Sequence, residues 1–249
     1  MLTLEKIRKD HDGIRIVFTG HTHRQLYVEN HIASILNPGA VENSLWGYEF
    51  AVFNTKTGEA VFSRIMPNHP VCSPVKIGVI SDSRNISDLN SYFWVKLQTE
   101  LNKQGVKHII HCGNLAKSDI GREELKEFEI YFNLETAINS TPANWHKIDP
   151  ENPIVKIGGY RFCVQHNLGE GLMEKTEKDI LQLSLQLAGK YPETEFVLFG
   201  FTHQAYLEEN EQVIVLNPGD VVRDQSFVII EVPRNEITFS KIPRSPLSS

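Results

Sequence analysis

Histidines in a short motif are the residues of this chain best suited to metal chemistry. His21 and His23 stand in the sequence Gly-His-Thr-His, and 180 positions later the chain has Gly-Phe-Thr-His, with Phe201 and His203 at the corresponding places. Histidine nitrogens suit Mn, Fe and Zn ions. The two copies of the motif therefore differ at a residue type that binds metal.

The repetition extends beyond the histidines. Asn-Pro-Gly follows each motif by fourteen residues, at 37–39 and at 217–219. Farther along, Phe-Ser-Arg-Ile at 62–65 matches Phe-Ser-Lys-Ile at 239–242 after a slip of three residues. Elements that recur at one fixed offset indicate an internal repeat.

Other polar residues follow apolar runs that we predict to be strands. These residues are Asp82, Asn114 and His166. In α/β folds the chemistry is placed at the carboxyl ends of strands.

The alternation of strands and helices predicts an α/β domain with a largely buried sheet. We predict strands over residues 14–19, 50–53, 60–65, 76–82, 107–112, 137–139, 160–165 and 196–199, and a hairpin over 26–36. Helices are predicted over residues 3–10, 89–104, 123–132 and 174–190. Three prolines between residues 66 and 74 indicate a linker.

Composition is that of an ordinary soluble globular protein, with 41% apolar and 22% charged residues among 249. A net charge of −6 without a long basic run argues against nucleic-acid binding. No apolar stretch approaches the ~20 residues needed to span a bilayer, so we expect no membrane partner. The charged N-terminus is not a signal peptide, and three cysteines without close pairing indicate no disulfide framework. We expect a cytoplasmic protein.

In order and spacing, these motifs resemble the calcineurin-like metallophosphoesterases, in their small bacterial and archaeal phosphodiesterase branch. The signatures of that family are Asp-x-His, Gly-Asp, Gly-Asn-x-Asp, a strand ending in His-Gly, and Gly-His-x-His followed by Asn-Pro-Gly. Residues 76–242 match the whole order, whereas residues 1–65 match only its last third. The resemblance implies an αββα sandwich of two sheets flanked by helices. We therefore expect a partial domain at 1–66, a linker at 67–75 and a complete domain at 76–249.

The resemblance also implies two divalent metal ions, which clamp a phosphate ester and generate a hydroxide nucleophile. This chain departs from the ligand set. Arg84 stands where a histidine belongs, Asn114 replaces the aspartate that bridges the ions, and Phe201 replaces the first histidine of the last motif. The Gly-Asn-x-Asp motif aligns near Asn139 with no aspartate in place. The remaining candidate ligands are Asp82, Asn114, His166 and His203, and Asn139 is a further candidate.

Arg84 is the substitution that weighs most against metal binding. A guanidinium binds no metal, and beside Asp82 it would form a bidentate salt bridge. Its charge would repel a divalent ion by ~4–8 kcal/mol at an effective dielectric near 20. We expect this chain to bind no metal, or one divalent ion (Mn, Fe, Zn or Ni) weakly.

His21 and His23 lack every ligand that precedes them in the family. We interpret them as a preserved turn, with completion of the site by another chain and adventitious metal binding as alternatives. The strands of this partial copy should expose an apolar sheet face, which the second domain, a second copy of the chain or a separate partner must cover. We expect a homo-oligomer or a partner protein at this face. Alternatively, Met1 is not the natural start.

The preferred function is a non-catalytic structural or protein-binding module with a degenerate dinuclear metal site. The retromer subunit that keeps this fold as a protein-binding platform is an analogy for such a role. One alternative is a metal-dependent phosphodiesterase or phosphatase whose active first domain is truncated here. The other is a sensor that binds phosphate or a phosphate ester with Arg84, His166 and His203.

Overall fold

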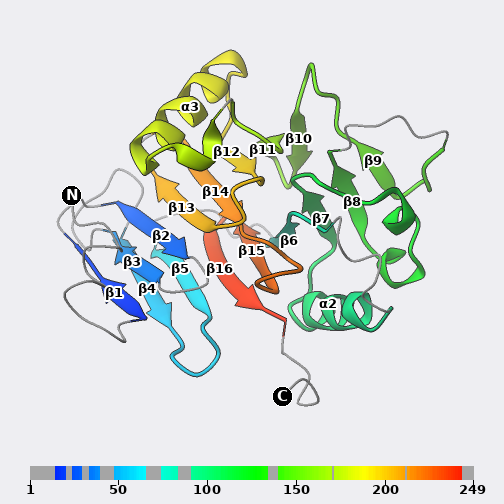
Figure 1. Cartoon of the computed structure of the whole chain (residues 1–249), viewed down its shortest axis with the longest axis horizontal. Coiled ribbons are helices and arrows are strands. Elements are labelled where there is room, and N and C mark those ends of the chain that lie inside the picture. Colours follow the sequence, from blue (N-terminus) through cyan, green and yellow to red (C-terminus); the bar gives the residue numbers. More distant parts are fainter. Residues whose placement is uncertain are drawn as a thin grey trace.

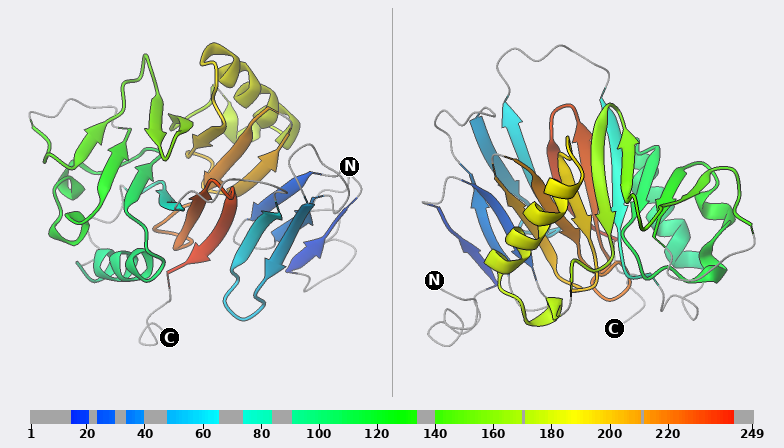
Figure 2. Two further views of the ribbon diagram at one scale, coloured as in Figure 1. Left: turned by 180° about the vertical axis from the view of Figure 1, so that it is seen from behind. Right: turned by 90° about the horizontal axis from the view of Figure 1, so that it is seen from above.

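The computed structural model describes residues 15–20, 24–29, 34–39, 48–65, 74–83, 91–133, 140–169, 171–210 and 212–242. These residues form two eight-stranded sheets packed face to face, with one α-helix on the outer side of each sheet (Figures 1 and 2). The predicted α/β sandwich of two sheets flanked by helices is therefore confirmed.

The first sheet carries the parallel strands that lead to His166 and His203. Its order is β1 (Ile16–Phe18), β3 (Ser34–Pro38), β2 (Gln25–Glu29), β13 (Ala205–Glu209), β14 (Ile214–Pro218), β12 (Phe196–Phe199), β11 (Tyr160–Gln165) and β10 (Ile154–Ile157). Strands β11, β12 and β14 are parallel neighbours. Their carboxyl ends therefore meet at one edge of the sheet.

The second sheet carries the parallel strands that lead to Asp82 and Asn114. Its order is β4 (Tyr48–Phe53), β5 (Ala60–Ile65), β16 (Glu236–Lys241), β15 (Ser226–Val232), β6 (Val75–Ile80), β7 (His108–His111), β8 (Glu129–Phe132) and β9 (Trp145–Lys147). Strands β6 to β9 are parallel to one another.

Three apolar clusters hold the four layers together. The central cluster lies between the sheets and includes Val79 and Leu198, both fully buried. Helix α2 (Ser91–Lys103) packs Leu97 and Leu101 against the outer face of the second sheet, as the four-residue spacing of a helical face predicts. Helix α3 (Glu177–Lys190) covers the outer face of the first sheet and begins with a capping box at Thr176. Neither helix is long and apolar enough to cross a membrane, and the same holds for every described helix.

The helix predicted over residues 123–132 is wrong. Only η3 (Glu123–Leu125) is helical there, and the segment continues as strand β8 between β7 and β9. Buried Ile130 and Phe132 alternate with less buried neighbours, which is the period of a strand. The charged residues before β8 resemble the polar face of an amphipathic helix, and this resemblance led to the wrong prediction. The predicted helix 3–10 and strand 137–139 lie outside the described residues.

The remaining predictions of strands and of the two α-helices agree with the structure to within a few residues. Two short 3-10 helices, η2 (Lys117–Asp119) and η4 (Leu172–Glu174), lie in connecting segments. The short strands β9 and β10 and the last four strands, β13 to β16, were not predicted.

Strands from the first 65 residues extend both sheets rather than standing apart. Strand β2 pairs with β13, and β5 pairs with β16, both antiparallel. The inward side chains Tyr27, Leu36 and Phe62 belong to the central cluster. Later strands of the same chain thus cover the inner face of this segment, which is one of the three coverings that the sequence left open.

Candidate functional site

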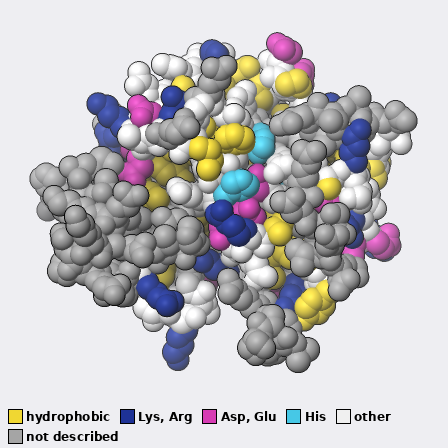
Figure 3. Space-filling model, in the orientation of Figure 1, with side chains coloured by type: hydrophobic (Ala, Val, Ile, Leu, Met, Phe, Trp, Pro, Cys, Tyr) yellow, Lys and Arg dark blue, Asp and Glu magenta, His cyan; other side chains and the backbone are white. Residues whose placement is uncertain are grey.

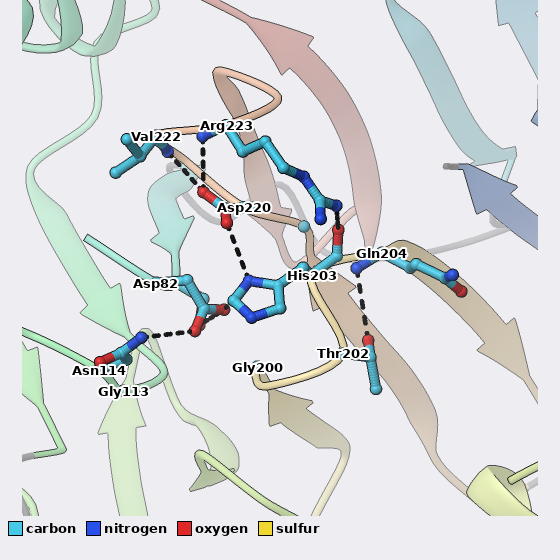
Figure 4. A network of polar contacts seen from close by, with 12 residues as sticks. Asp82, Gly113, Asn114, Gly200, Thr202, His203, Gln204, Asp220, Val222 and Arg223 are labelled. Atoms are coloured by element: carbon cyan, nitrogen blue, oxygen red, sulfur yellow. Dashed lines mark hydrogen bonds and ion pairs between the residues drawn. The ribbon is translucent and has the colours of Figure 1, made fainter. Parts of the chain in front are cut away.

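Polar side chains gather at one edge of the sandwich, where parallel strands of both sheets end. Asp82 follows β6 and Asn114 follows β7 in the second sheet, while His166 follows β11 and His203 lies between β12 and β13 in the first. Because these strand ends meet at the same edge, the four side chains lie close together. Figure 4 shows three of them, Asp82, Asn114 and His203. In the space-filling view of Figure 3, histidine side chains lie beside acidic and basic ones near the middle of the face in view.

The carboxylate of Asp82 lies at the centre of this cluster. Asp82 is buried, with 4% of its surface exposed. Oδ2 accepts a hydrogen bond from Ser81 Oγ at 2.8 Å, and Oδ1 accepts one from Asn114 Nδ2 at 3.3 Å. His166 Nε2 lies 3.2 Å from Oδ1. Burial raises the pKa of Asp82, but the hydrogen bonds from His166 and Ser81 and the charge of His203 outweigh burial and leave that pKa below its ordinary value. Asp82 is therefore an anion at neutral pH.

His203 faces two carboxylates. Its Nδ1 lies 2.8 Å from Asp220 Oδ2 and 3.9 Å from Asp82 Oδ2. The other oxygen of Asp220 accepts hydrogen bonds from the main-chain N–H groups of Val222 and Arg223 at 2.8 and 2.7 Å. Arg223 Nη2 donates to the carbonyl of His203 at 2.8 Å. Both oxygens of Asp220 are thus engaged within the protein.

The backbone of the site adopts left-handed conformations that L-residues seldom occupy. Among the described residues, seven other than glycine have positive φ, and four of them belong to this site: Asp82 at 61°, Asn114 at 57°, Phe201 at 69° and His203 at 57°. Strained backbone of this kind concentrates at functional sites. Its presence indicates that the strand ends here are arranged for side-chain placement.

Two glycines let the loops approach one another. A Cβ on Gly113 would lie 2.4 Å from His166 Cβ, and a Cβ on Gly200 would lie 2.0 Å from Ser81 Oγ. Both distances are far below van der Waals contact, so side chains at these positions would separate the loops. Gly113 thus lets the end of β7 approach His166, and Gly200 lets the end of β12 approach Ser81, which precedes Asp82.

His111 and Ser83 form a buried pair next to Asp82. Ser83 Oγ lies 2.8 Å from His111 Nε2, and the N–H of Gly113 donates to His111 Nδ1 at 3.2 Å. Because Nδ1 accepts that bond, the ring proton of neutral histidine is on Nε2 and is donated to the hydroxyl. Burial lowers the pKa of His111 to about 4. His111 therefore orients Ser83 and does not act as a base toward it.

The structure brings together Asp82, Asn114, His166 and His203, as the sequence predicts. The ring of Phe201 contacts the ring of His166 edge to face at a centroid distance of 5.5 Å. His21, His23, Arg84 and Asn139 lie outside the described residues, so their roles stay predictions.

Sequence reasoning missed two polar residues at the site's edge. Asn133 directly follows β8, and its Nδ2 donates to the carbonyls of Cys112 at 3.5 Å and Val164 at 3.1 Å. The strand end before it was hidden because that segment was predicted to be a helix. Asp220, the partner of His203, directly follows Asn-Pro-Gly, and the first copy has Ala40 at the corresponding place. That difference between the copies was the signal that could have identified Asp220.

Among the described residues, the donors do not fit the pair of metal ions that the resemblance implies. Asn114 turns its NH₂ group toward Asp82, so a hydrogen-bond donor faces the carboxylate where a bridging anionic oxygen would be required. Phe201 stands where the family's Gly-His-x-His motif has its first histidine, and a phenyl ring offers no donor to a metal ion. In the part of the chain that the structure describes, no group of three or more His, Cys, Asp or Glu side chains is arranged to hold a metal ion.

Comparison with known proteins agrees with the fold. Residues 75–235 match the family model of the calcineurin-like phosphoesterase superfamily domain. The chain is 29% identical to a phosphodiesterase of Methanocaldococcus jannaschii over 59% of this chain and 84% of the relative. It is 27% identical to a probable metallophosphoesterase of Methanothermobacter thermautotrophicus over 57% of this chain and 75% of the relative. The solved structure of vacuolar protein sorting 29 from Cryptosporidium parvum is similar with a TM-score of 0.47 and 17% identity, covering 67% of this chain and 89% of that one.

Proposed function

Because the chain belongs to the calcineurin-like phosphoesterase superfamily, we propose that it keeps the sandwich of these metal-dependent enzymes without their two-metal hydrolysis. The observation that carries this proposal is the amide of Asn114, whose nitrogen donates to Asp82 Oδ1 at 3.3 Å. Two cations roughly 3.5–4 Å apart repel each other strongly. A neutral amide between them cannot offset that repulsion as a carboxylate does.

The rest of the network supports the same proposal. Asp82 is bound by Ser81, Asn114 and His166, and His203 is directed at Asp220. Metal binding would require breaking several of these charge-assisted hydrogen bonds, each of which contributes about 1.5–3 kcal/mol. The polar cluster instead joins the two sheets at their common edge. The chain is then a structural or protein-binding module.

The test is hydrolysis of bis(p-nitrophenyl) phosphate in the presence of Mn²⁺. We expect the parent chain to show no metal-dependent rate above buffer. The variant that carries Arg84→His, Asn114→Asp and Phe201→His together restores the family's ligand types and should gain a Mn²⁺-dependent rate. A parent rate that depends on Mn²⁺ and disappears in Asp82→Ala would overturn the proposal.

The runner-up is a phosphodiesterase. It is favoured by the gathering of Asp82, His166 and His203 in one cluster and by the name of the M. jannaschii relative. A phosphate sensor has less support, because His166 and His203 each direct a ring nitrogen at a carboxylate and an anion would meet the charges of Asp82 and Asp220. For the sensor, Arg84→Ala should abolish binding of inorganic phosphate in a calorimetric titration.

A further inference from the structure

We propose that strands β1 to β5 and strands β12 to β16 are two copies of one structural unit that meet about a two-fold axis. Strands β13 and β16 then form a surface suited to binding a second copy of the same surface. The proposal does not depend on whether the polar site binds metal. It names a second copy of these strands as the partner that this surface fits.

The pairings within the two segments support their equivalence. Strands β1 to β5 follow the same order as β12 to β16, and the same strands pair in each segment. Tyr27 lies opposite Leu36 as Leu207 lies opposite Leu216, both after a shift of 180. Ala51 lies opposite Phe62 as Val228 lies opposite Phe239, both after a shift of 177. The register is thus the same in both segments and in both sheets.

The two segments meet through equivalent strands in each sheet. In the first sheet β2 pairs antiparallel with β13, and Tyr27 lies opposite its own equivalent, Leu207. In the second sheet β5 pairs antiparallel with β16, and Val61 lies opposite its own equivalent, Thr238. Figure 1 shows β2 beside β13 and β5 beside β16, and one two-fold axis through both pairs would relate the two segments in both sheets.

Side-chain contacts across this junction are reciprocal. Ser63 Oγ donates to Glu236 Oε2 at 3.1 Å, and Ser240 Oγ donates to Glu59 Oε1 at 3.1 Å. Ser63 corresponds to Ser240 and Glu59 to Glu236 after the shift of 177. Such exchange, in which residue i contacts j and j contacts i, is the signature of an isologous interface between like subunits.

The proposal leads to a prediction for a shortened chain that lacks strands β1 to β5. Strands β13 and β16 would then be open edges, and an open edge pairs readily with another strand. Because the junction is self-complementary, the partner that fits both edges is a second molecule of the same segment. Residues 75–235 match a family domain by themselves, which supports folding of residues 74–249 alone.

The experiment compares residues 74–249 with the full chain by analytical ultracentrifugation. We expect the shorter chain to sediment as a dimer, and Thr238→Cys in it to form a disulfide with its own copy because that residue lies on the axis. Glu236→Cys, two residues away on the same strand, is the matched control and should not link. The same Thr238→Cys in the full chain should not link, since Val61 occupies the position opposite. The described native cysteines, Cys112 and Cys163, are buried.

A folded, monomeric 74–249 chain would overturn the proposal, as would equal linking of the two cysteine variants. If residues 74–249 do not fold alone, the proposal is tested by disulfide formation in the full chain. Val61→Cys with Thr238→Cys should then form an intramolecular disulfide, because directly opposite positions have Cβ atoms about 4.5–5.5 Å apart. Val61→Cys with Glu236→Cys is out of register and should stay reduced. Failure of the first pair to oxidise would contradict the axis.

Discussion

At the scale of single residues, the polar side chains of the site form one connected network of hydrogen bonds and ion pairs. The carboxyl groups of Asp82 and Asp220 lie on either side of His203, and His166 approaches Asp82 from the other sheet. Buried polar groups of this kind stabilise a fold only when each has its partner. We therefore propose that the network stabilises the fold without a metal.

Asp220→Ala tests that role. Its removal leaves the N–H groups of Val222 and Arg223 without their acceptor, so we expect the free energy of unfolding to fall by about 1–3 kcal/mol. Asp220→Asn keeps an acceptor oxygen and should lose less. The control is Asp224→Ala, which removes a surface ion pair with Arg223 and should change stability by less than about 1 kcal/mol. Urea unfolding of the three variants measures the difference, and equal midpoints for Asp220→Ala and Asp224→Ala would refute the structural role.

The burial of His111 leads to a prediction of how the free energy of unfolding depends on pH. Its pKa is about 4 in the folded chain because it is buried, whereas an unfolded histidine titrates near 6.5. The unfolded state therefore binds more protons between these values, and stability falls as pH decreases from 6.5 to 4, by about 3 kcal/mol in total. Unfolding measured across this range should show a shallower slope in His111→Gln. An unchanged slope would mean that His111 is not the group responsible.

At the scale of elements, the sequence could predict the strands that end at Asp82, Asn114 and His166, because each is an apolar run closed by polar residues. It could not predict β8, since Glu123, Glu124 and Lys126 before it have the charge pattern of a helix surface. The parallel pairing of β8 with β7 decided its conformation. Pairing of this kind is non-local and leaves little trace in a short window of sequence. Asn133 was missed for the same reason.

The junction of β5 and β16 allows a test by matched substitutions. Ser63→Ala and Ser240→Ala each remove one hydrogen bond to a glutamate at equivalent places, so each should lower the free energy of unfolding by about 1–2 kcal/mol. If the junction is two-fold, the two losses should agree to within about 0.5 kcal/mol. Thr55→Ala in the exposed β4–β5 turn is the control and should have little effect. A large loss for one serine and none for the other would argue against equivalence.

At the scale of the whole molecule, one sandwich serves both segments of the chain. The first 65 residues contribute Tyr27 and Phe62 to the central cluster and extend each sheet. The polar site lies elsewhere, at the strand ends of residues 75–220, so the junction and the site are separate features of one fold.

The central claim is that this site does not hold two metal ions, and a calorimetric titration of the metal-stripped chain with Mn²⁺ tests it most directly. Circular dichroism of the same sample would show that the chain is folded. We predict no tight binding. Two tight sites would contradict this claim. They would show that Asn114, His166 and His203 can bind a pair of metal ions in place of their hydrogen bonds to Asp82 and Asp220.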